Sequence, residues 1–427
     1  AYAAPLAGRN MTTAFPDPDI IIDGGALGVS DGLLMLIREA LEPLPPGSVV
    51  AVRTAHPTVE HDLPAWCRIM AHSFLGSDGS TFYFRKGDVN PPTTAKPDWG
   101  VHIPLRADGE FHTRDWLVGR VGDVPEHATG ATGFAPRGAV VEPGSPSFDF
   151  TFNDRAQVWA GEVADLYEQA TANQWDASRD IPWSELKPLP APVERAVCQL
   201  MTFLAENEYS ALYVPAKFVP RINPQFAEVV FFLCTQMADE ARHIEAFTKR
   251  ALANGGGLQY AAASTQLSLK TLFDQHDFTV ASFLLSVLGE GTFLDLLRFI
   301  EDHAPDPVTA EVCRRARVDE TRHVKFGMAH VRYYLGEDPA HFDELRLAVK
   351  ARAAVMASVT EVSPRVQDAL AVLAAGGMDP ARLGDGVRKV RELMADMHEH
   401  RLKRLVQAGF TAAQADEMSR LHTPNFM

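Results

Sequence analysis

The sequence predicts a multidomain α+β protein that is mainly α-helical, and three observations support this fold class. Its 427 residues exceed what a single ordinary core holds. Short strand and helix patterns alternate near the N-terminus, and long apolar helical segments follow from about residue 154. We therefore predict a tail at 1–16, a small two-layer α/β domain at 17–90, a Pro/Gly-rich linker at 91–150, a four-helix bundle at 151–340 and a C-terminal helical extension at 341–427.

The N-terminal domain is predicted from five short segments. "DIIIDGG" at 19–25, "SVVAVRTA" at 48–55 and "STFYFRKG" at 80–87 have strand composition and are bounded by turn residues. Between them, "SDGLLMLIREALEPL" and "DLPAWCRIMAHSFLG" place apolar residues at helical spacing. The resulting β-α-β-α-β order predicts a two-layer α/β fold.

The remainder of the chain is predicted to be helical after the linker. Long segments interrupted by "VPRINP", "NGGG" and "APDP" run over 192–218, 224–253, 264–302 and 306–336. Long apolar helices with short connections are typical of a helix bundle. A further helical stretch at about 342–420 contains "GGMDPARLGDG", which reads as a helix–helix connection.

Composition excludes several classes of partner. The net charge of −15 argues against nucleic acid, which requires a basic face. We expect no membrane span and no signal-peptide core. The four cysteines are far apart in sequence, which argues against a disulfide framework or a thiolate metal site and favours a cytoplasmic protein; they are Cys67, Cys198, Cys234 and Cys313.

A pentapeptide is nearly repeated, as "DEARH" at 239–243 and "DETRH" at 319–323. In each copy a glutamate and a histidine stand three residues apart, so both side chains leave the same helical face. That face is otherwise apolar, and a buried carboxylate is costly unless it is paired or binds a metal. The two copies therefore predict two halves of one metal site.

A further glutamate precedes each copy. Laying "LAENEY" on "LGEGTF" pairs Glu206 with Glu290; Glu208 is the alternative, because these helices are apolar nearly all round. Four carboxylates and two imidazoles are the ligands of a carboxylate-bridged di-iron centre. The predicted ligands are Glu206, Glu240, His243, Glu290, Glu320 and His323.

The neighbouring residues predict a supporting shell. Asp239 and Asp319 could each accept a hydrogen bond from the histidine of the opposite motif, and Arg242 and Arg322 could pair with these aspartates. Three aromatic residues at helical spacing from the ligands could line a pocket, although core packing is the default for such residues; they are Tyr209, Phe247 and Phe293.

The region from about 154 to 336 resembles the ferritin-like superfamily of di-iron carboxylate proteins. The doubled D-E-x-R-H resembles the hydroxylase subunits of bacterial multicomponent monooxygenases, and the ligand pattern also resembles p-aminobenzoate N-oxygenases and the radical-bearing subunit of ribonucleotide reductase. The resemblance implies two iron ions, dioxygen activation and oxidation of an organic substrate. Phe247 stands where the reductase subunit carries its radical tyrosine, and Ala316 stands where some N-oxygenases carry an extra histidine.

The N-terminal domain resembles the small sulfur-carrier proteins in its "DGG" and "AWCR" segments. That family carries its reactive cysteine in a Cys-Pro-x-Pro turn at the start of the first helix. This chain has "VSDG" there, from Val29 to Gly32. We therefore expect a docking or regulatory module without sulfur-carrier activity.

Together these observations predict a non-haem di-iron oxygenase or oxidase acting on a small molecule by C–H hydroxylation or N-oxygenation, as in specialised metabolism. The sequence lacks a strand–G-x-G-x-x-G–helix fingerprint, so we expect electrons from an external reductase or ferredoxin. We also expect a homodimer. The alternatives are an iron-handling ferritin-like protein and a non-enzymatic interaction protein with a structural metal.

Overall fold

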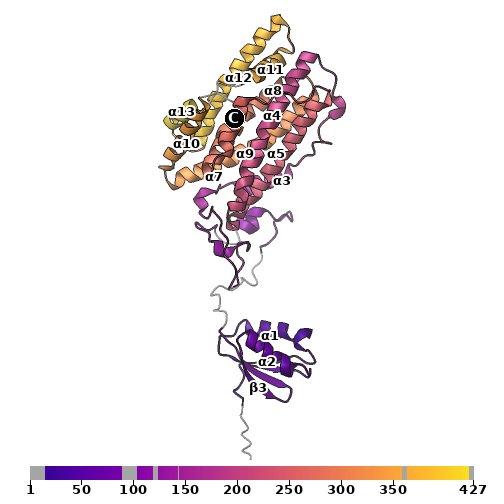
Figure 1. Cartoon of the computed structure of the whole chain (residues 1–427), viewed down its shortest axis with the longest axis vertical. Helices are drawn as coiled ribbons and strands as arrows, with labels where there is room; N and C mark the ends of the chain where they lie inside the picture. The colour runs from indigo at the N-terminus through magenta and orange to yellow at the C-terminus, as the bar shows by residue number, and fades with distance from the viewer. Residues whose placement is uncertain (1–14, 89–102, 119–123, 143, 358–362, 423–427) are drawn as a thin grey trace, which may run out of the picture. The chain divides into compact units, whose positions relative to one another are not determined.

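The computed structural model describes residues 15–88, 103–118, 124–142, 144–357 and 363–422 (Figure 1). The chain divides into two compact units: Ala1–Lys96 with Glu142–Gly144, and the remainder. Most of the predicted tail and the segment 89–102 of the predicted linker lie outside the described residues. Each unit has its own apolar core within the described residues.

The N-terminal unit is a mixed sheet covered by two helices. Its described elements are β1 (Ile20–Asp23), α1 (Leu33–Leu41), β2 (Val49–Arg53), α2 (Val59–Ile69), β3 (Ser73–Asp78) and β4 (Thr81–Arg85). The strand order is β1-β2-β4-β3, with β1 parallel to β2 and the other pairs antiparallel. Leu33 and Ile37 of α1 pack with Val50 and Phe84 of the sheet.

The predicted order is wrong at one element, because the second helix ends earlier and an additional strand follows it. Ala71 has a φ of 47°, in the left-handed region that terminates helices. The amide of His72 donates to the carbonyl of Cys67 across this turn. The chain then forms β3 where a continued helix was expected, so the unit is β-α-β-α-β-β.

The second unit confirms the predicted four-helix bundle. Its long helices are α4 (Ala191–Phe218), α5 (Ala227–Ala253), α8 (Gly291–Asp302) and α9 (Pro307–Glu337). The helix α4 packs along α5, α8 packs along α9, and α5 contacts α9 (Figure 1). The shorter α3 (Val163–Ala172) lies against α5 and α9.

The predicted helix over 264–302 is interrupted. It consists of α6 (Ala263–Phe273), α7 (Phe278–Ser282), the π-helix η8 (Phe283–Glu290) and α8. A new helix starts at Phe278 because the Asp277 side chain accepts a hydrogen bond from the Val280 amide, 2.8 Å away.

One segment of this bundle contradicts the expectation that no stretch could cross a membrane. Phe278–Asp302 is long and apolar enough to do so by length and composition. However, 83% of its most apolar window is buried inside the protein, as expected for a core helix.

The C-terminal extension forms four described helices on one side of the bundle (Figure 1). Of these, α11 packs on α4 and α12 packs on α8, while α10 contacts α6 and α13. The predicted connection is shorter than expected, because α12 begins within the "GGMDPARLGDG" stretch. The bounds are α10 (His341–Met356), α11 (Pro364–Ala375), α12 (Pro380–Gln407) and α13 (Ala412–Leu421).

Candidate metal centre

Four carboxylates and two imidazoles meet inside the bundle, one set from each pair of helices. Their ligand atoms form two groups, and within each group all atoms lie within 4.8 Å of one another. Every one of these side chains is buried. Glu240 and Glu320 belong to both groups, as bridging carboxylates between two metal ions would. The first group is Glu208, Glu240, His243 and Glu320, and the second is Glu240, Glu290, Glu320 and His323.

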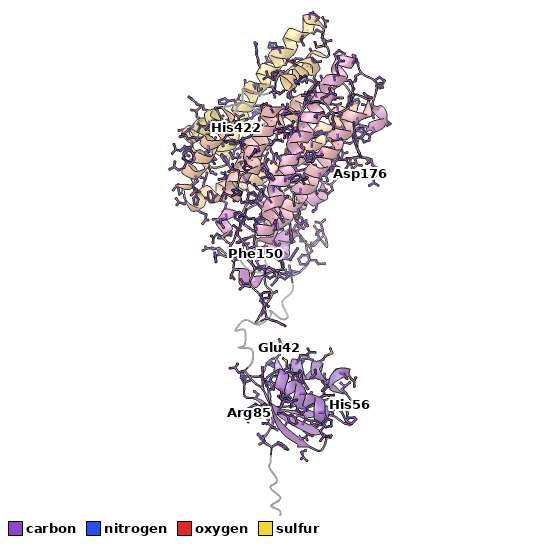
Figure 2. The ribbon with its side chains drawn as sticks, viewed as in Figure 1. Glu42, His56, Arg85, Phe150, Asp176 and His422 are labelled. Carbon is purple, nitrogen blue, oxygen red and sulfur yellow. The ribbon has the colours of Figure 1, made fainter. Side chains whose placement is uncertain are left out.

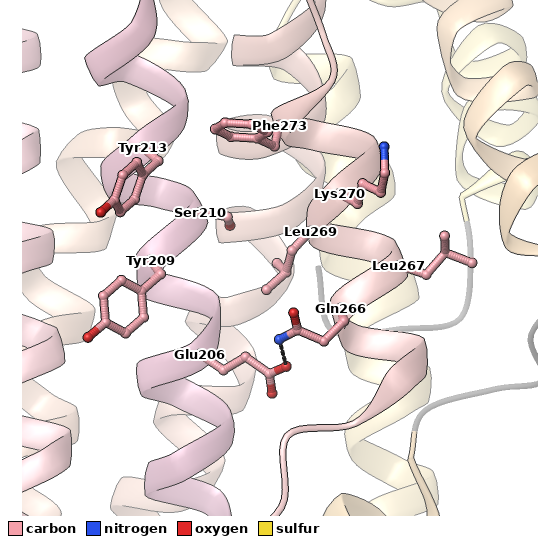
Figure 3. Close-up of a pocket in the computed structure, with 9 residues that line it drawn as sticks. All are labelled: Glu206, Tyr209, Ser210, Tyr213, Gln266, Leu267, Leu269, Lys270 and Phe273. Atoms are coloured by element: carbon pink, nitrogen blue, oxygen red, sulfur yellow. Dashed lines mark hydrogen bonds between the residues drawn. The ribbon is translucent and has the colours of Figure 1, made fainter.

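The predicted placement of Glu206 in this cluster is wrong, and Glu208 takes that place. Glu206 points to the opposite side of α4, where it accepts a hydrogen bond from Gln266 of α6 in a surface groove (Figure 3). Two residues along an α-helix correspond to roughly 200° of rotation, so only one of the two glutamates can face the bundle interior. The Glu208 Oε1 atom lies 3.7 Å from His243 Nδ1.

The carboxylate oxygens of the cluster fit a pair of cations. Four of them are buried and have no hydrogen-bond partner, one each from Glu208, Glu240, Glu290 and Glu320. An unpaired buried carboxylate oxygen is strongly unfavourable. The four carboxylates carry a charge that two divalent cations would balance, and the oxygen and imidazole donors suit iron or manganese.

The two histidines are held crosswise, as the sequence predicts. His243 Nε2 donates to Asp319 Oδ2 at 3.2 Å, and His323 Nε2 donates to Asp239 Oδ2 at 3.3 Å. A carboxylate only accepts, so each Nε2 carries the proton. The other ring nitrogen, Nδ1, faces the glutamates; His323 Nδ1 lies 3.0 Å from Glu240 Oε1.

Two arginines hold these aspartates ionised. Arg242 donates to Asp239 and, at 3.2 Å, to Asp319. Arg322 donates to Asp319 and, at 3.1 Å, to Asp239. Although burial raises the pKa of Asp319, its hydrogen bond from His243 and the charge of Arg322 hold that pKa well below its usual value. This buried network is therefore neutral, and the charge of the glutamates is left for the metals.

The pKa shifts in the metal-free site also reflect the excess negative charge of the glutamates. Burial and the charges of Glu240 and Glu320 raise the pKa of Glu208 well above its usual value. Burial lowers the pKa values of His243 and His323, but their carboxylate neighbours raise both well above the usual value. Without metal, protons partly neutralise the cluster; cations at the Nδ1 atoms would displace them.

Three supporting residues were not predicted. Trp175 Nε1 donates to Asp319 Oδ2 at 2.7 Å, and Gln174 Nε2 donates to Asp239 Oδ1 at 3.2 Å. Nothing in the sequence marks these two, which reach the site from the segment after α3. Gln236 donates to Glu290 Oε1 at 3.1 Å. It stands four residues before Glu240 on the same helical face. A polar residue on that otherwise apolar stripe could have predicted its role.

The three predicted pocket aromatics do not line the cavity beside the cluster. Tyr209 is 52% exposed and faces the same groove as Glu206 (Figure 3). Phe247 is buried with its ring centroid 6.3 Å from that of His243, and Phe293 packs against Phe203.

A small apolar cavity does adjoin the cluster. It has about 20 Å³ of free space, roughly the room of one water molecule. Its polar side chains are Ser282, Ser286 and Gln236, and Gln236 hydrogen bonds to Glu290. Its lining consists of Val214, Pro215, Phe218, Leu233, Gln236, Phe278, Ala281, Ser282, Leu285, Ser286 and Phe326.

Fold and donor set together define the class: a helix bundle that carries a dimetal-type carboxylate–histidine site. No family model matches the chain. Among solved structures it is similar to an R2-like ligand-binding oxidase with aerobically reconstituted Mn/Fe cofactor (long soak), at 18% identity and a TM-score of 0.39, over 63% of this chain and 95% of that one. It is also similar to a single-residue mutant of such an oxidase with the same cofactor, at 16% identity and a TM-score of 0.42, over 62% and 95% of the two chains.

Proposed function

We propose that this protein is a dimetal oxidase that uses dioxygen to oxidise a small organic substrate. One observation carries the proposal: the two buried ligand groups share Glu240 and Glu320 and leave carboxylate oxygens without partners. Such a site would hold two metal ions close together, and these would supply the redox chemistry with dioxygen when bound.

Iron is the metal we propose for both positions. The donors are oxygen-rich with one imidazole per group, which suits iron and manganese alike. The two groups are not equivalent, because Gln236 hydrogen bonds to Glu290. Since the similar solved structures contain Mn/Fe, loading with iron alone and with iron plus manganese would distinguish the two compositions.

The cavity beside Glu290 favours oxidation of a substrate over iron storage. Its walls are mostly apolar; its polar side chains are Gln236, Ser282 and Ser286, and Gln236 hydrogen bonds to Glu290. These apolar walls suit a small, largely apolar molecule, with C–H hydroxylation or N-oxygenation as the proposed reaction. Because the free space is only about 20 Å³, side chains must move to admit it. We further propose an external reductase or ferredoxin as the electron donor.

The test is a single turnover with dioxygen. The protein is loaded anaerobically with ferrous iron, mixed with dioxygen and followed by stopped-flow absorption and freeze-quench Mössbauer spectroscopy. Two coupled irons per chain that oxidise within seconds are expected. The Glu320→Ala variant should lose this behaviour, whereas Glu206→Gln, a glutamate outside the cluster, should keep it.

Other outcomes would point to the alternatives. Loaded protein that ignores dioxygen would indicate a structural metal and overturn the proposal. A large hollow assembly that takes up many irons per chain would indicate iron storage. Zinc or a single iron at the site would show that the cluster is not a redox pair.

A further inference from the structure

A second buried cluster of charge lies in the C-terminal extension and has the opposite sign. It contains three arginines around His422, which Figure 2 labels on this part of the molecule. Arg352 belongs to α10, Arg401 and Arg404 belong to α12, and His422 follows α13. We call these four residues the arginine cluster. Arg401 and His422 are 8% and 7% exposed, so both are more than nine-tenths buried.

Several nitrogens of this cluster have no partner among the described residues. Both ring nitrogens of His422 are buried without a hydrogen bond, and so is Nε of Arg401. Arg401 makes only long contacts, at 3.4 Å to Ser419 Oγ and to Thr292 Oγ1. The metal centre likewise has buried polar atoms without partners, but there they are carboxylate oxygens, which accept hydrogen bonds.

Arg404 is bound as weakly as Arg401. Its one described hydrogen bond reaches Asp295 at 3.5 Å, and its Nε and Nη2 are buried without partners. Its guanidinium packs against Gly291, where an added Cβ would lie 2.6 Å from Arg404 Nε. Gly291 directly follows the ligand Glu290, so the arginine cluster lies against the helix that carries that ligand.

Among the described residues, the charges of Arg401 and Arg404 are not balanced by the carboxylate next to them. Arg401 and Arg404 both lie near Asp295, but Asp295 also accepts a hydrogen bond from His400 at 2.8 Å. Burial lowers the pKa of Arg401 to about 10, so the group is still charged at neutral pH. Burial and the three arginine charges keep His422 neutral by lowering its pKa. Among the described residues, the buried guanidiniums of Arg401 and Arg404 share the single carboxylate of Asp295 and therefore call for an additional anion.

We propose that the arginine cluster binds a small oxyanion of the phosphate, sulfate or carboxylate type. The guanidinium fork matches the geometry of such groups, and neutral His422 offers one further N–H. Arg352, which already donates to Thr271 and Ser268, adds its charge to the same region. The site is separate from the proposed oxidation chemistry and does not depend on it.

The first test asks what the purified full-length protein retains. The protein is exchanged into chloride buffer and acid-denatured, and the supernatant is analysed by ion chromatography and mass spectrometry. Retained phosphate or sulfate would identify a free inorganic anion, and a retained organic acid would identify a metabolite as the source.

The second test measures binding directly. Thermal unfolding is followed against increasing inorganic phosphate, with ionic strength held constant by chloride. A saturable rise in Tm is expected for wild type and for Arg388→Gln, an exposed arginine of the same helix. Arg401→Gln should lose that rise. Arg401→Lys, which keeps the charge but not the fork, should bind phosphate at least tenfold more weakly and serves if the glutamine variant does not fold.

The proposal has clear contrary outcomes. It is overturned if the denatured protein releases no anion and phosphate, sulfate and acetate all leave Tm unchanged relative to chloride. An equal rise in wild type and in both Arg401 variants would also overturn it, because the anion would then bind elsewhere.

Discussion

Glu206 and Glu208 are two residues apart on α4 but lie in opposite environments. Glu208 faces His243 inside the bundle, whereas Glu206 faces Gln266 at a surface groove. We predict that Glu208→Gln reduces metal content from about two ions per chain to one or fewer, since one group then loses a ligand. Glu206→Gln should retain both. Metal analysis after anaerobic loading and desalting checks this, and equal losses in the two variants would contradict it.

His330 is a buried core histidine on α9 and predicts a pH dependence of stability. Its Nδ1 donates to the Trp159 carbonyl, and its Nε2 accepts from Thr279 Oγ1. Burial lowers its pKa to about 4, against 6.5 for the exposed side chain. As pH falls from 6.5 to 4, the unfolded chain binds a proton that the folded protein does not, so stability decreases by up to about 3 kcal/mol.

The measurement is urea unfolding at several pH values for wild type and His330→Asn. Asparagine keeps a donor for the Trp159 carbonyl but does not titrate. The variant should lose less stability between pH 6.5 and 4 than wild type does, whatever its stability at neutral pH. Parallel curves would show that His330 is not responsible.

At the scale of elements, η8 and α9 meet at a glycine. A Cβ on Gly327 would lie 2.6 Å from the Ser286 Cβ, so alanine there must displace η8. We predict that Gly327→Ala destabilises the protein by roughly 1–3 kcal/mol through overpacking. Because Ser286 and the ligand Glu290 belong to the same π-helix, metal affinity should fall as well.

Gly336 on the same helix is the matched control. A Cβ there meets nothing within 4 Å. Gly336→Ala should therefore be neutral or stabilising by up to about 1 kcal/mol, as expected for a helical glycine. Chemical denaturation of the metal-free proteins separates the packing effect from metal binding. If Gly327→Ala left the free energy of unfolding unchanged, η8 would be able to move aside without loss of stability.

The elements also show what sequence could predict. The spacing within each Glu-x-x-His motif fixes its face on a regular helix, so four of the six clustered residues and their crosswise aspartates were found. The prediction of Glu206 over Glu208 was wrong because laying "LAENEY" on "LGEGTF" assumes that both segments turn by the same angle per residue. Glu290 ends a π-helix, whose wider turn changes the rotation per residue, whereas Glu208 lies in a regular α-helix.

The remaining differences have similar causes. The strand β3 was missed because Ala71 adopts a left-handed conformation that its residue type does not suggest. Trp175 reaches the site only through tertiary packing, which brings its indole N–H to Asp319. Neither feature follows from local spacing.

At the scale of the molecule, the two compact units predict separable folding. The helical unit has its own apolar core and all six residues of the metal cluster. Deleting residues 1–96 should leave a helical protein with unchanged metal content and a cooperative unfolding transition. Circular dichroism and metal analysis of the truncated protein test this; loss of metal would show that the N-terminal unit supports the site.

The crosswise hydrogen bonds predict an effect that crosses between helix pairs. Asp319 belongs to the second motif but holds His243 of the first. Asp319→Asn should therefore weaken metal binding at the His243 position by roughly 10–100-fold. Asp302→Asn, which changes an exposed aspartate at the end of α8, is the control. Competition with a chelator measures affinity, and a loss confined to the His323 position would contradict the prediction.

The same crosswise arrangement has the symmetry of a homodimer folded into one chain. In a two-fold interface, residue i of one copy touches residue j of the other, and j touches i in return. Asp239 with His323 and Asp319 with His243 follow this rule. Each helix pair therefore positions the histidine of the other pair. A substitution in either half that moves its aspartate must also move the histidine across the pseudo-two-fold axis.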